Sequence, residues 1–135
     1  MTAAEIVLDA SVAVRGLLAE SSAPVVVADN IVSGGMSAHA PGLIVSEVTN
    51  ALRTRVDAER WPLREAAAAL DVFLDWPLSI RPSPPLATAA LAFAVEHGLS
   101  AYDAFYAVLS EALEAPLYTS DRRLAAAVHG SVLVA

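Results

Sequence analysis

Short apolar runs that end at polar residues alternate along the chain with longer segments in which apolar side chains recur at helical spacing. Short runs rich in Val, Ile and Leu are typical of buried strands, whereas the longer periodic segments are typical of helices. Strands are predicted at 6–8, 36–40, 78–80, 117–119 and 132–134. Helices are predicted at 12–18, 25–32, 43–60, 63–74, 86–96, 101–113 and 122–128.

Proline and glycine refine this pattern. A Trp-Pro pair at 61–62 separates two predicted helices, and Pro82, Pro84 and Pro85 predict a stiff loop with no helical turn. The Val-rich stretch 25–32 also suits a strand, but its polar positions and the glycine pair that follows favour a helix. The order of elements predicts an α/β fold for residues 1–135 as a single domain. We expect a three-layer α/β/α sandwich with a central, mainly parallel sheet.

Composition narrows the class of protein. Of the 135 residues, 56% are hydrophobic and 17% are charged, which favours one compact globule over a disordered chain. The formal net charge of -7 argues against binding nucleic acid or an anionic membrane through overall charge. It leaves open an enzyme that acts on nucleic acid and gathers its acidic residues in one metal site.

Cysteine and lysine are both absent from the sequence. Without cysteine there is no disulfide, no thiolate nucleophile and no cysteine-bound zinc. All eight basic residues are arginine, so a P-loop lysine, a Schiff-base lysine and the lysine of aspartate-type phospho-acceptor sites are all missing. The three histidines are scattered, which makes a histidine-rich metal site unexpected.

No apolar run approaches the roughly 20 residues that a membrane-spanning helix needs, and the longest candidate is 86–95. The first residues include Glu5 and Asp9 and lack a basic region, so no signal peptide is expected. We therefore expect a cytoplasmic protein that does not associate with a membrane.

Four acidic residues stand out by their positions. Asp9 and Asp121 directly follow predicted strands, at the edge where open α/β sheets bind ligands. Glu47 and Asp103 lie in or beside helices whose neighbouring positions are apolar, where an acid is unfavourable unless it is paired or binds a metal. We expect the four carboxylates to converge, and a hard cation such as Mg²⁺ to relieve their repulsion.

Each of these acids taken singly has a simpler interpretation. Asp121 and Asp103 both stand near predicted helix starts, where a carboxylate can cap the first backbone N–H groups. Glu47, between Val45 and Val48, is the hardest to explain in this way. Both interpretations stay open for any one acid, and the joint pattern favours a shared site.

Four segments resemble the PIN-domain family, and in particular the VapC toxins of bacterial toxin–antitoxin systems. They occur in the order and with the spacing of the family and together span nearly the whole chain: IVLDASV at 6–12, APGLIVSEVTNAL at 40–52, SAYDAFY at 100–106 and LYTSDRRL at 117–124. The resemblance implies a parallel sheet between layers of helices. It also implies a metal-dependent endoribonuclease that uses Mg²⁺, with Mn²⁺ as a substitute.

The resemblance assigns roles to individual residues. It implies that the catalytic and metal-binding acids are Asp9, Glu47, Asp103 and Asp121. We expect Asp9 and Asp103 to contact the metal directly, Asp121 to bind a second ion or orient water, and Glu47 to support the site or act as general base. The supporting polar positions implied by the resemblance are Ser11, Asn50 and Thr119.

Other side chains are candidates for contact with RNA. Arg122 and Arg123 directly follow Asp121 and are either phosphate contacts or ordinary solvated charges. The arginines around 61–62 are expected to pair with neighbouring acids rather than to bind RNA. Tyr106 and other aromatic residues near the acids could stack on bases, although core packing or a partner groove is the favoured role.

The resemblance implies RNA as substrate, a small VapB-type antitoxin that places a basic side chain in the acidic crevice, and a homodimer. Two alternatives remain open at this level. One is a PIN-fold module that binds partners without catalysis. The other is a phospho-acceptor domain of the receiver or phosphatase type, which also places Asp after the first strand but normally needs a lysine.

Overall fold

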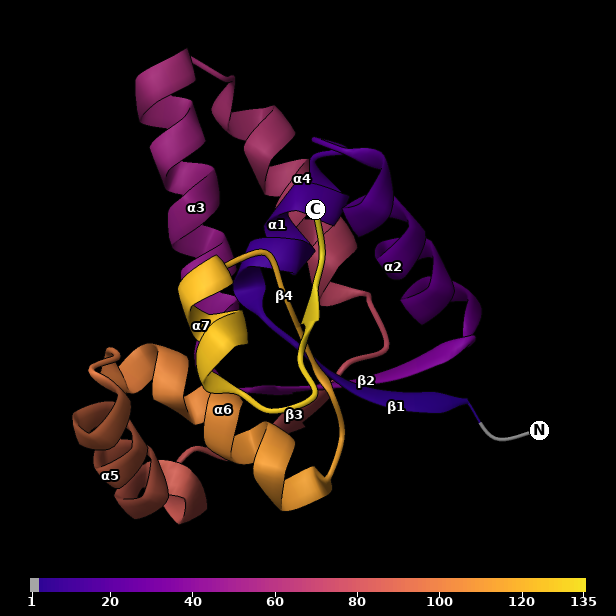
Figure 1. Cartoon of the computed structure of the whole chain (residues 1–135). Helices are drawn as coiled ribbons and strands as arrows, with labels where there is room; N and C mark the ends of the chain where they lie inside the picture. Colours follow the sequence, from indigo (N-terminus) through magenta and orange to yellow (C-terminus); the bar gives the residue numbers. More distant parts are fainter. Residues whose placement is uncertain (1–2) are drawn as a thin grey trace.

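The computed structural model describes residues 3–135 and contains a five-stranded sheet at its centre (Figure 1). The strand order is β3-β2-β1-β4-β5, and every neighbouring pair is parallel. The sheet therefore matches the predicted parallel arrangement, with the first strand in the middle. The strands are β1 (Ala4–Leu8), β2 (Met36–Pro41), β3 (Ser79–Arg81), β4 (Leu117–Thr119) and β5 (Val132–Leu133).

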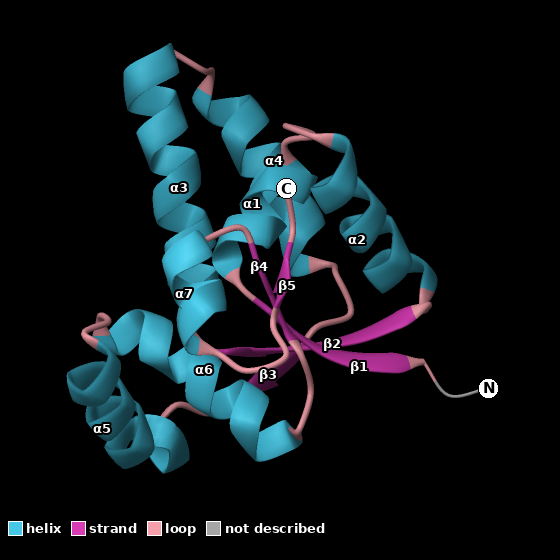
Figure 2. Cartoon of the chain, in the orientation of Figure 1, coloured by secondary structure: helices cyan, strands magenta, loops and turns pink. Residues whose placement is uncertain are grey.

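Helices cover both faces of the sheet, as Figure 2 shows, which confirms the three-layer α/β/α prediction. One group consists of α2, α3 and α4 packed around α1, and the other of α5 and α7 packed against α6. The two groups lie on opposite faces because right-handed connections run one way across the sheet from β1 to β3 and the other way from β3 to β5. The α-helices of residues 3–135 are α1 (Ala10–Leu17), α2 (Ser22–Ser33), α3 (Leu43–Glu59), α4 (Leu63–Leu74), α5 (Ala87–His97), α6 (Ala101–Leu113) and α7 (Arg122–Ala127).

Burial on both faces explains the uniformly apolar sequence of β1. Ile6, Val7 and Leu8 are all buried, so this strand does not alternate between apolar and polar residues. Ile31 of α2 and Ile44 of α3 are buried completely in the same core. Each such side chain stabilises the fold by about 1.5–3 kcal/mol relative to an exposed position.

The order in which strands are added to the sheet reverses at β1, between β1 and β4. β2 and β3 lie on one side of β1, whereas β4 and β5 lie on the other. Leu8 pairs in register with Tyr118, so Asp9 and Thr119 leave neighbouring strands at the same edge of the sheet. Open parallel sheets bind ligands outside the carboxyl ends of the strands at such a reversal. The topology thus selects the place where the functional residues gather.

The Val-rich segment forms helix α2, as predicted. Its buried residues are Pro24, Val27, Ala28 and Ile31, which recur at the three- and four-residue spacing of one helix face. Gly34 ends the helix with φ at 87°, a left-handed conformation that glycine adopts without steric strain. Periodicity and the terminating glycine therefore outweigh the strand preference of valine.

The prediction that the proline-rich segment contains no helical turn is wrong. Pro84–Leu86 forms a single 3₁₀ turn that leads directly into α5. Both prolines lie in the first positions of this turn, where a backbone N–H would have no partner inside the turn. Proline is unfavourable in the interior of a helix, but its fixed φ suits this start.

Within residues 3–135, no single helix is long and apolar enough to cross a membrane. The pair α1 and α2 meets the length and hydrophobicity criteria only when combined, and it bends by 95° at the break.

The contact between α1 and α2 leads to a prediction about Gly16. A Cβ atom at this position would lie 2.7 Å from the carbonyl oxygen of Pro24 and 3.1 Å from the Cβ of Ala28. Because backbone atoms must move to relieve the clash, we expect Gly16→Ala to lower the free energy of unfolding by about 1–3 kcal/mol. Chemical denaturation measures this change.

Gly35→Ala is the control, because a Cβ there meets no atom closer than 3.5 Å. Its effect is expected to stay within about 0.5 kcal/mol. Equal stability of the two variants would contradict the close approach of α1 and α2.

Candidate active site

The candidate active site begins where β1 and β4 end side by side. The Asp9 N–H donates to the carbonyl oxygen of Tyr118 at 3.0 Å, which continues the pairing of the two strands by one residue. Asp9 is 5% exposed and Thr119 is fully buried. Asp9 also occupies the N-cap position of α1, but its side chain makes no capping hydrogen bond. Its carboxylate is therefore available for other contacts.

Two hydroxyl groups hold the Asp9 carboxylate from opposite ends of the sequence. Ser11 Oγ donates to Asp9 Oδ2 at 2.6 Å, and Thr119 Oγ1 donates to the same oxygen at 2.7 Å. Each hydroxyl also accepts a backbone hydrogen bond: Ser11 from the N–H of Ser120, and Thr119 from the N–H of Asp121, both at 3.0 Å. This orients both hydroxyl protons towards Asp9. The predicted supporting roles of Ser11 and Thr119 thus correspond to direct contacts with Asp9.

Glu47 is held by a tyrosine from the opposite group of helices. It projects from α3 and is half-buried, and its Oε1 accepts a hydrogen bond of 2.6 Å from the hydroxyl of Tyr106 in α6. Burial raises the pKa of the Tyr106 hydroxyl, and the negative charges of Glu47 and Asp9 raise it further. The hydroxyl therefore stays protonated and acts as a donor.

Asp103 and Asp121 both lie at helix starts, but the capping interpretation is right only for Asp121 and wrong for Asp103. Asp121 is the N-cap of α7, and its Oδ1 accepts from the N–H groups of Arg123 and Leu124 at 2.9 and 3.2 Å. In α6 the N-cap is Ser100, whose Oγ accepts from the N–H of Asp103 at 3.1 Å. For Asp121 the roles of cap and site residue therefore do not exclude each other, because its charge also raises the pKa of Asp9 and of Asp103.

The charges of the four acids act on one another. Burial raises the pKa of Asp9, of Glu47 and of Asp103, and in each case a neighbouring carboxylate raises it further. Asp9 interacts in this way with all three other acids. Without a counter-charge, ionising the whole group is therefore unfavourable.

An oxygen-rich, negatively charged site of this kind suits a hard divalent cation. Among residues 3–135, no three carboxylate or imidazole groups are close enough to ligate one ion together. Mg²⁺ is usually bound through one or two carboxylates and retains several of its water ligands. The donor set therefore fits such an ion better than a cation that requires a complete protein cage.

Asn50 and Arg122 lie at the margin of this cluster. Asn50 is exposed and lines an open hollow of about 330 Å³ together with Glu47, Ser46, Leu43 and Tyr102. Arg122 is also exposed, and it makes no ion pair within the described chain. Neither side chain contacts the acids through a hydrogen bond among residues 3–135.

Arg123 is the arginine that acts on the acids. Its guanidinium donates to the carbonyl oxygen of Gly98, and its charge lowers the pKa of Asp103 against the raising effects of burial and the other acids. Sequence position alone could not separate Arg122 from Arg123, because both directly follow Asp121 and both are exposed.

Tyr106 belongs to the candidate site, although the sequence favoured core packing or a partner groove over a contact with substrate. Its ring is fully buried, as core packing requires, but its hydroxyl serves Glu47. One feature of the sequence could have indicated that Tyr106 belongs to the site. It lies three residues after Asp103, which places both side chains on one face of α6.

The arginines near the Trp-Pro break follow their predicted pairing only in part. Arg53 pairs with Asp57 at 3.4 Å, and Arg55 pairs with Glu59 at 3.7 Å. Arg55 also pairs with Glu20, which lies far away in the sequence. Helical spacing predicted the local partners but not this one.

Comparison with known proteins adds independent findings. The profile of the PIN domain family matches residues 6–129. Ribonuclease VapC1 from Mycobacterium tuberculosis is 36% identical over 125 residues, covering 91% of this chain and 90% of that protein. VapC ribonuclease Mb0985 from Mycobacterium bovis is 32% identical over 119 residues, covering 88% and 87%.

Two solved structures are similar in fold. The crystal structure of PAE2754 from Pyrobaculum aerophilum has a TM-score of 0.77 at 30% identity, covering 95% of this chain and 82% of that one. The structure of VapBC2 from Rickettsia felis, bound to a DNA fragment from its promoter, has a TM-score of 0.66 at 13% identity and covers 95% and 96%. At such low identity the second similarity concerns the fold alone.

The electrostatics of the site predict a stabilising substitution. Because Asp9→Asn removes a buried charge that its neighbours repel, we expect it to raise the free energy of unfolding of the metal-free protein at neutral pH by on the order of 1 kcal/mol. The pKa of Asp9 in the folded protein is raised above the ordinary value of 3.8. The gain should therefore shrink as the pH falls through the raised pKa of folded Asp9 and vanish below 3.8, where Asp9 is protonated in both folded and unfolded states.

Chemical denaturation in EDTA over a pH series measures this difference. Asp29→Asn is the matched control, because Asp29 is an exposed acid on α2. A less stable Asp9→Asn protein at neutral pH would mean that the hydrogen bonds from Ser11 and Thr119 outweigh the cost of burying the charge.

Proposed function

Because this chain belongs to the PIN domain family, we propose that it is a metal-dependent endoribonuclease, the toxin of a VapBC-type toxin–antitoxin system. The match to ribonucleases VapC1 and Mb0985 over nearly the full length of each protein supports this activity. Membership of this family removes the phospho-acceptor alternative, which the absence of lysine already disfavoured.

One observation carries the proposal: carboxylates from four separate elements interact through their charges near the carboxyl edge of the sheet, and these charges raise the pKa of Asp9, Glu47 and Asp103. Such a group is costly for a fold to maintain without a function. Its net negative charge attracts divalent cations, and only with such a cation can it approach the phosphate backbone of RNA.

We assign the metal contacts to Asp9 and Asp103, with Asp121 holding a second ion or orienting water. When bound, Mg²⁺ or Mn²⁺ would lower the pKa of a water ligand and neutralise charge that develops on the phosphate. Ser11 and Thr119 keep the Asp9 carboxylate in one orientation through Oδ2. Asp121 is oriented by capping α7 through Oδ1. Both carboxylates are thus arranged before any ligand binds.

Glu47 is our candidate for the general base. Tyr106 occupies its Oε1, so Oε2 is the oxygen that would accept a proton. The pKa of Glu47 is raised by burial and by the charges of Asp9 and Asp103, which makes it a stronger base than an exposed glutamate. Asn50 lines the same hollow and is our candidate for contacting the RNA beside Glu47. Arg122, exposed beside Asp121, is our candidate phosphate contact.

The proposal extends to partners and location. A basic segment of a VapB-type antitoxin would relieve the same carboxylate repulsion that a metal ion relieves, and would so compete with it. We further propose that residues 1–135 form one PIN domain, that two copies form a homodimer, and that the protein acts on RNA in the cytoplasm.

The direct test is incubation of the purified protein with total cellular RNA and Mg²⁺ or Mn²⁺. Discrete fragments are expected, and EDTA should abolish them. Asp103→Asn should reduce cleavage at least about hundredfold, because it removes a negative ligand from the metal. Its fold should be kept, since the N–H of residue 103 still bonds to Ser100.

Asp57→Asn is the matched control, because Asp57 is an exposed acid near the far end of α3 and pairs only with Arg53 among the described residues. It should cleave like the wild type. Folded wild-type protein that is free of antitoxin and leaves all RNA intact would favour a PIN-fold binding module. Undiminished cleavage by Asp103→Asn would remove Asp103 from the mechanism.

A second variant tests the role of Tyr106. Tyr106→Phe keeps the buried ring but removes the hydrogen bond to Glu47, so we expect cleavage to fall about 10- to 100-fold. Circular dichroism should be unchanged. Tyr118→Phe is the control, because the Tyr118 hydroxyl makes no hydrogen bond within residues 3–135. Equal rates for the two variants would exclude a contribution of the Tyr106 hydroxyl.

A further inference from the structure

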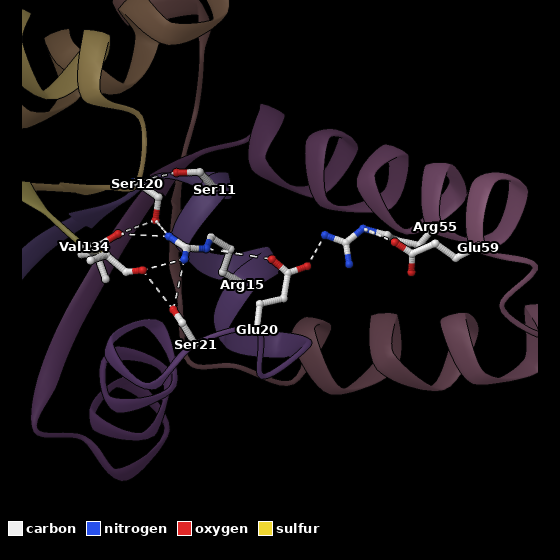
Figure 3. A network of polar contacts seen from close by, with 9 residues as sticks. Ser11, Arg15, Glu20, Ser21, Arg55, Glu59, Ser120 and Val134 are labelled. Carbon is white, nitrogen blue, oxygen red and sulfur yellow. Dashed lines mark hydrogen bonds and ion pairs between the residues drawn. The ribbon is translucent and has the colours of Figure 1, made fainter.

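Arg15 of α1 lies at the centre of a polar network that joins three parts of the chain (Figure 3). Its Nη1 donates to Ser120 Oγ at 3.0 Å and to the carbonyl oxygen of Val134 at 3.3 Å. Its Nη2 donates to Ser21 Oγ at 3.1 Å and to the carbonyl oxygen of Ala135 at 2.6 Å. The planar guanidinium can serve all four acceptors because it carries donors in a fixed fork.

This network reaches the active site through Ser120. Ser120 lies between Thr119 and Asp121, and its Oγ donates in turn to the carbonyl oxygen of Val134 at 2.8 Å. Its backbone N–H donates to Ser11 Oγ, the hydroxyl that bonds to Asp9. Ser11 and Arg15 are four residues apart on α1 and therefore share one face of that helix. One face of α1 thus holds Ser120 by both its backbone and its side chain.

We propose that Arg15 is a positioning residue for the nuclease site. By holding Ser120 against α1 and the segment Val134–Ala135, it keeps the loop 119–121 in the conformation in which Thr119 and Ser11 orient Asp9 and in which Asp121 faces the cluster. Arg15 itself contacts none of the four acids through a hydrogen bond or ion pair within the described chain. This inference rests on the proposed function, because it assigns a purpose to a fixed geometry of the acids.

The other half of the same network offers a matched control. Glu20 lies 3.9 Å from Arg15 Nε and also pairs with Arg55, which continues to Glu59 (Figure 3). The side chains of Arg15 and Arg55 are about equally exposed, at 30% and 29%. Arg15→Gln and Arg55→Gln therefore each remove one partly buried charge that pairs with Glu20, but only the first releases Ser120.

Three measurements on these two variants test the proposal. Amide hydrogen exchange at Ser120 and Asp121, without metal, should be faster in Arg15→Gln than in wild type. Mn²⁺ affinity and kcat for RNA cleavage should each fall about tenfold, whereas KM for RNA should stay unchanged. Arg55→Gln should leave all three quantities within about twofold of wild type, as expected for a partly exposed ion pair.

Ser120→Ala provides a second route, because it removes the side-chain acceptor on the loop and leaves Arg15 intact. Its loss of Mn²⁺ affinity should resemble that of Arg15→Gln, and the double variant should lose no more than either single one. If Arg15→Gln does not fold, the comparison of Ser120→Ala with Arg55→Gln decides the question in the same way.

The outcomes separate this inference from the proposed function. If the wild type cleaves RNA but Arg15→Gln and Arg55→Gln behave alike in exchange, Mn²⁺ affinity and kcat, the positioning role is overturned while the nuclease stands. Arg15→Gln could also lower the melting temperature while leaving amide exchange, Mn²⁺ affinity and kcat unchanged. That result would show a purely structural effect and would overturn the positioning role. Wild-type protein that neither cleaves RNA nor binds Mn²⁺ in an Asp9-dependent manner would overturn the proposed function, and this inference with it.

Discussion

A carboxylate buried where two parallel strands end is the constraint on which the rest of the site depends. Asp9 lies at the reversal point of the sheet, almost inaccessible to solvent and within the field of three other acids. Burying this charge is unfavourable unless neighbouring groups donate to it. The surrounding structure meets this need with Ser11 and Thr119, which reach Asp9 from the helix after β1 and from the last residue of β4.

The same requirement explains why so many backbone groups near the site have defined partners. The N–H groups of residues 120 and 121 bond to the two hydroxyls, and Arg15 holds the side chain of Ser120. Glu47 receives the hydroxyl of Tyr106 across the site. The carboxylates of Asp9, Glu47 and Asp121 are therefore oriented by neutral donors. Apart from the charge of Arg123 near Asp103, the repulsion among the acids is left for a cation to relieve. Neutral groups thus orient the acids while their negative charge stays largely uncompensated, which suits a site whose ligand carries the positive charge.

Capping and the proposed metal site share Asp121, because the start of a helix suits a carboxylate in either role. Asp121 uses Oδ1 to cap α7, and Asp103 lies in the first turn of α6. The N-terminus of a helix favours negative charge, so these positions lower part of the cost of gathering acids. A structural and a chemical role can thus coexist in one side chain when its two oxygens face different partners.

Local patterns along the chain are enough to predict most of the elements and the candidate acids. Periodicity and chain breaks predicted α2 as a helix and located the strands, because side-chain burial repeats locally at 3.6 or 2 residues. The sequence also indicated Asp9, Glu47, Asp103 and Asp121, through their positions at strand ends and on apolar faces. Three interactions are evident only in the folded chain: Tyr106 donates to Glu47, Arg123 rather than Arg122 acts on Asp103, and Arg15 donates to Ser120. These contacts join residues 20 to 105 positions apart, and no local periodicity encodes such pairings.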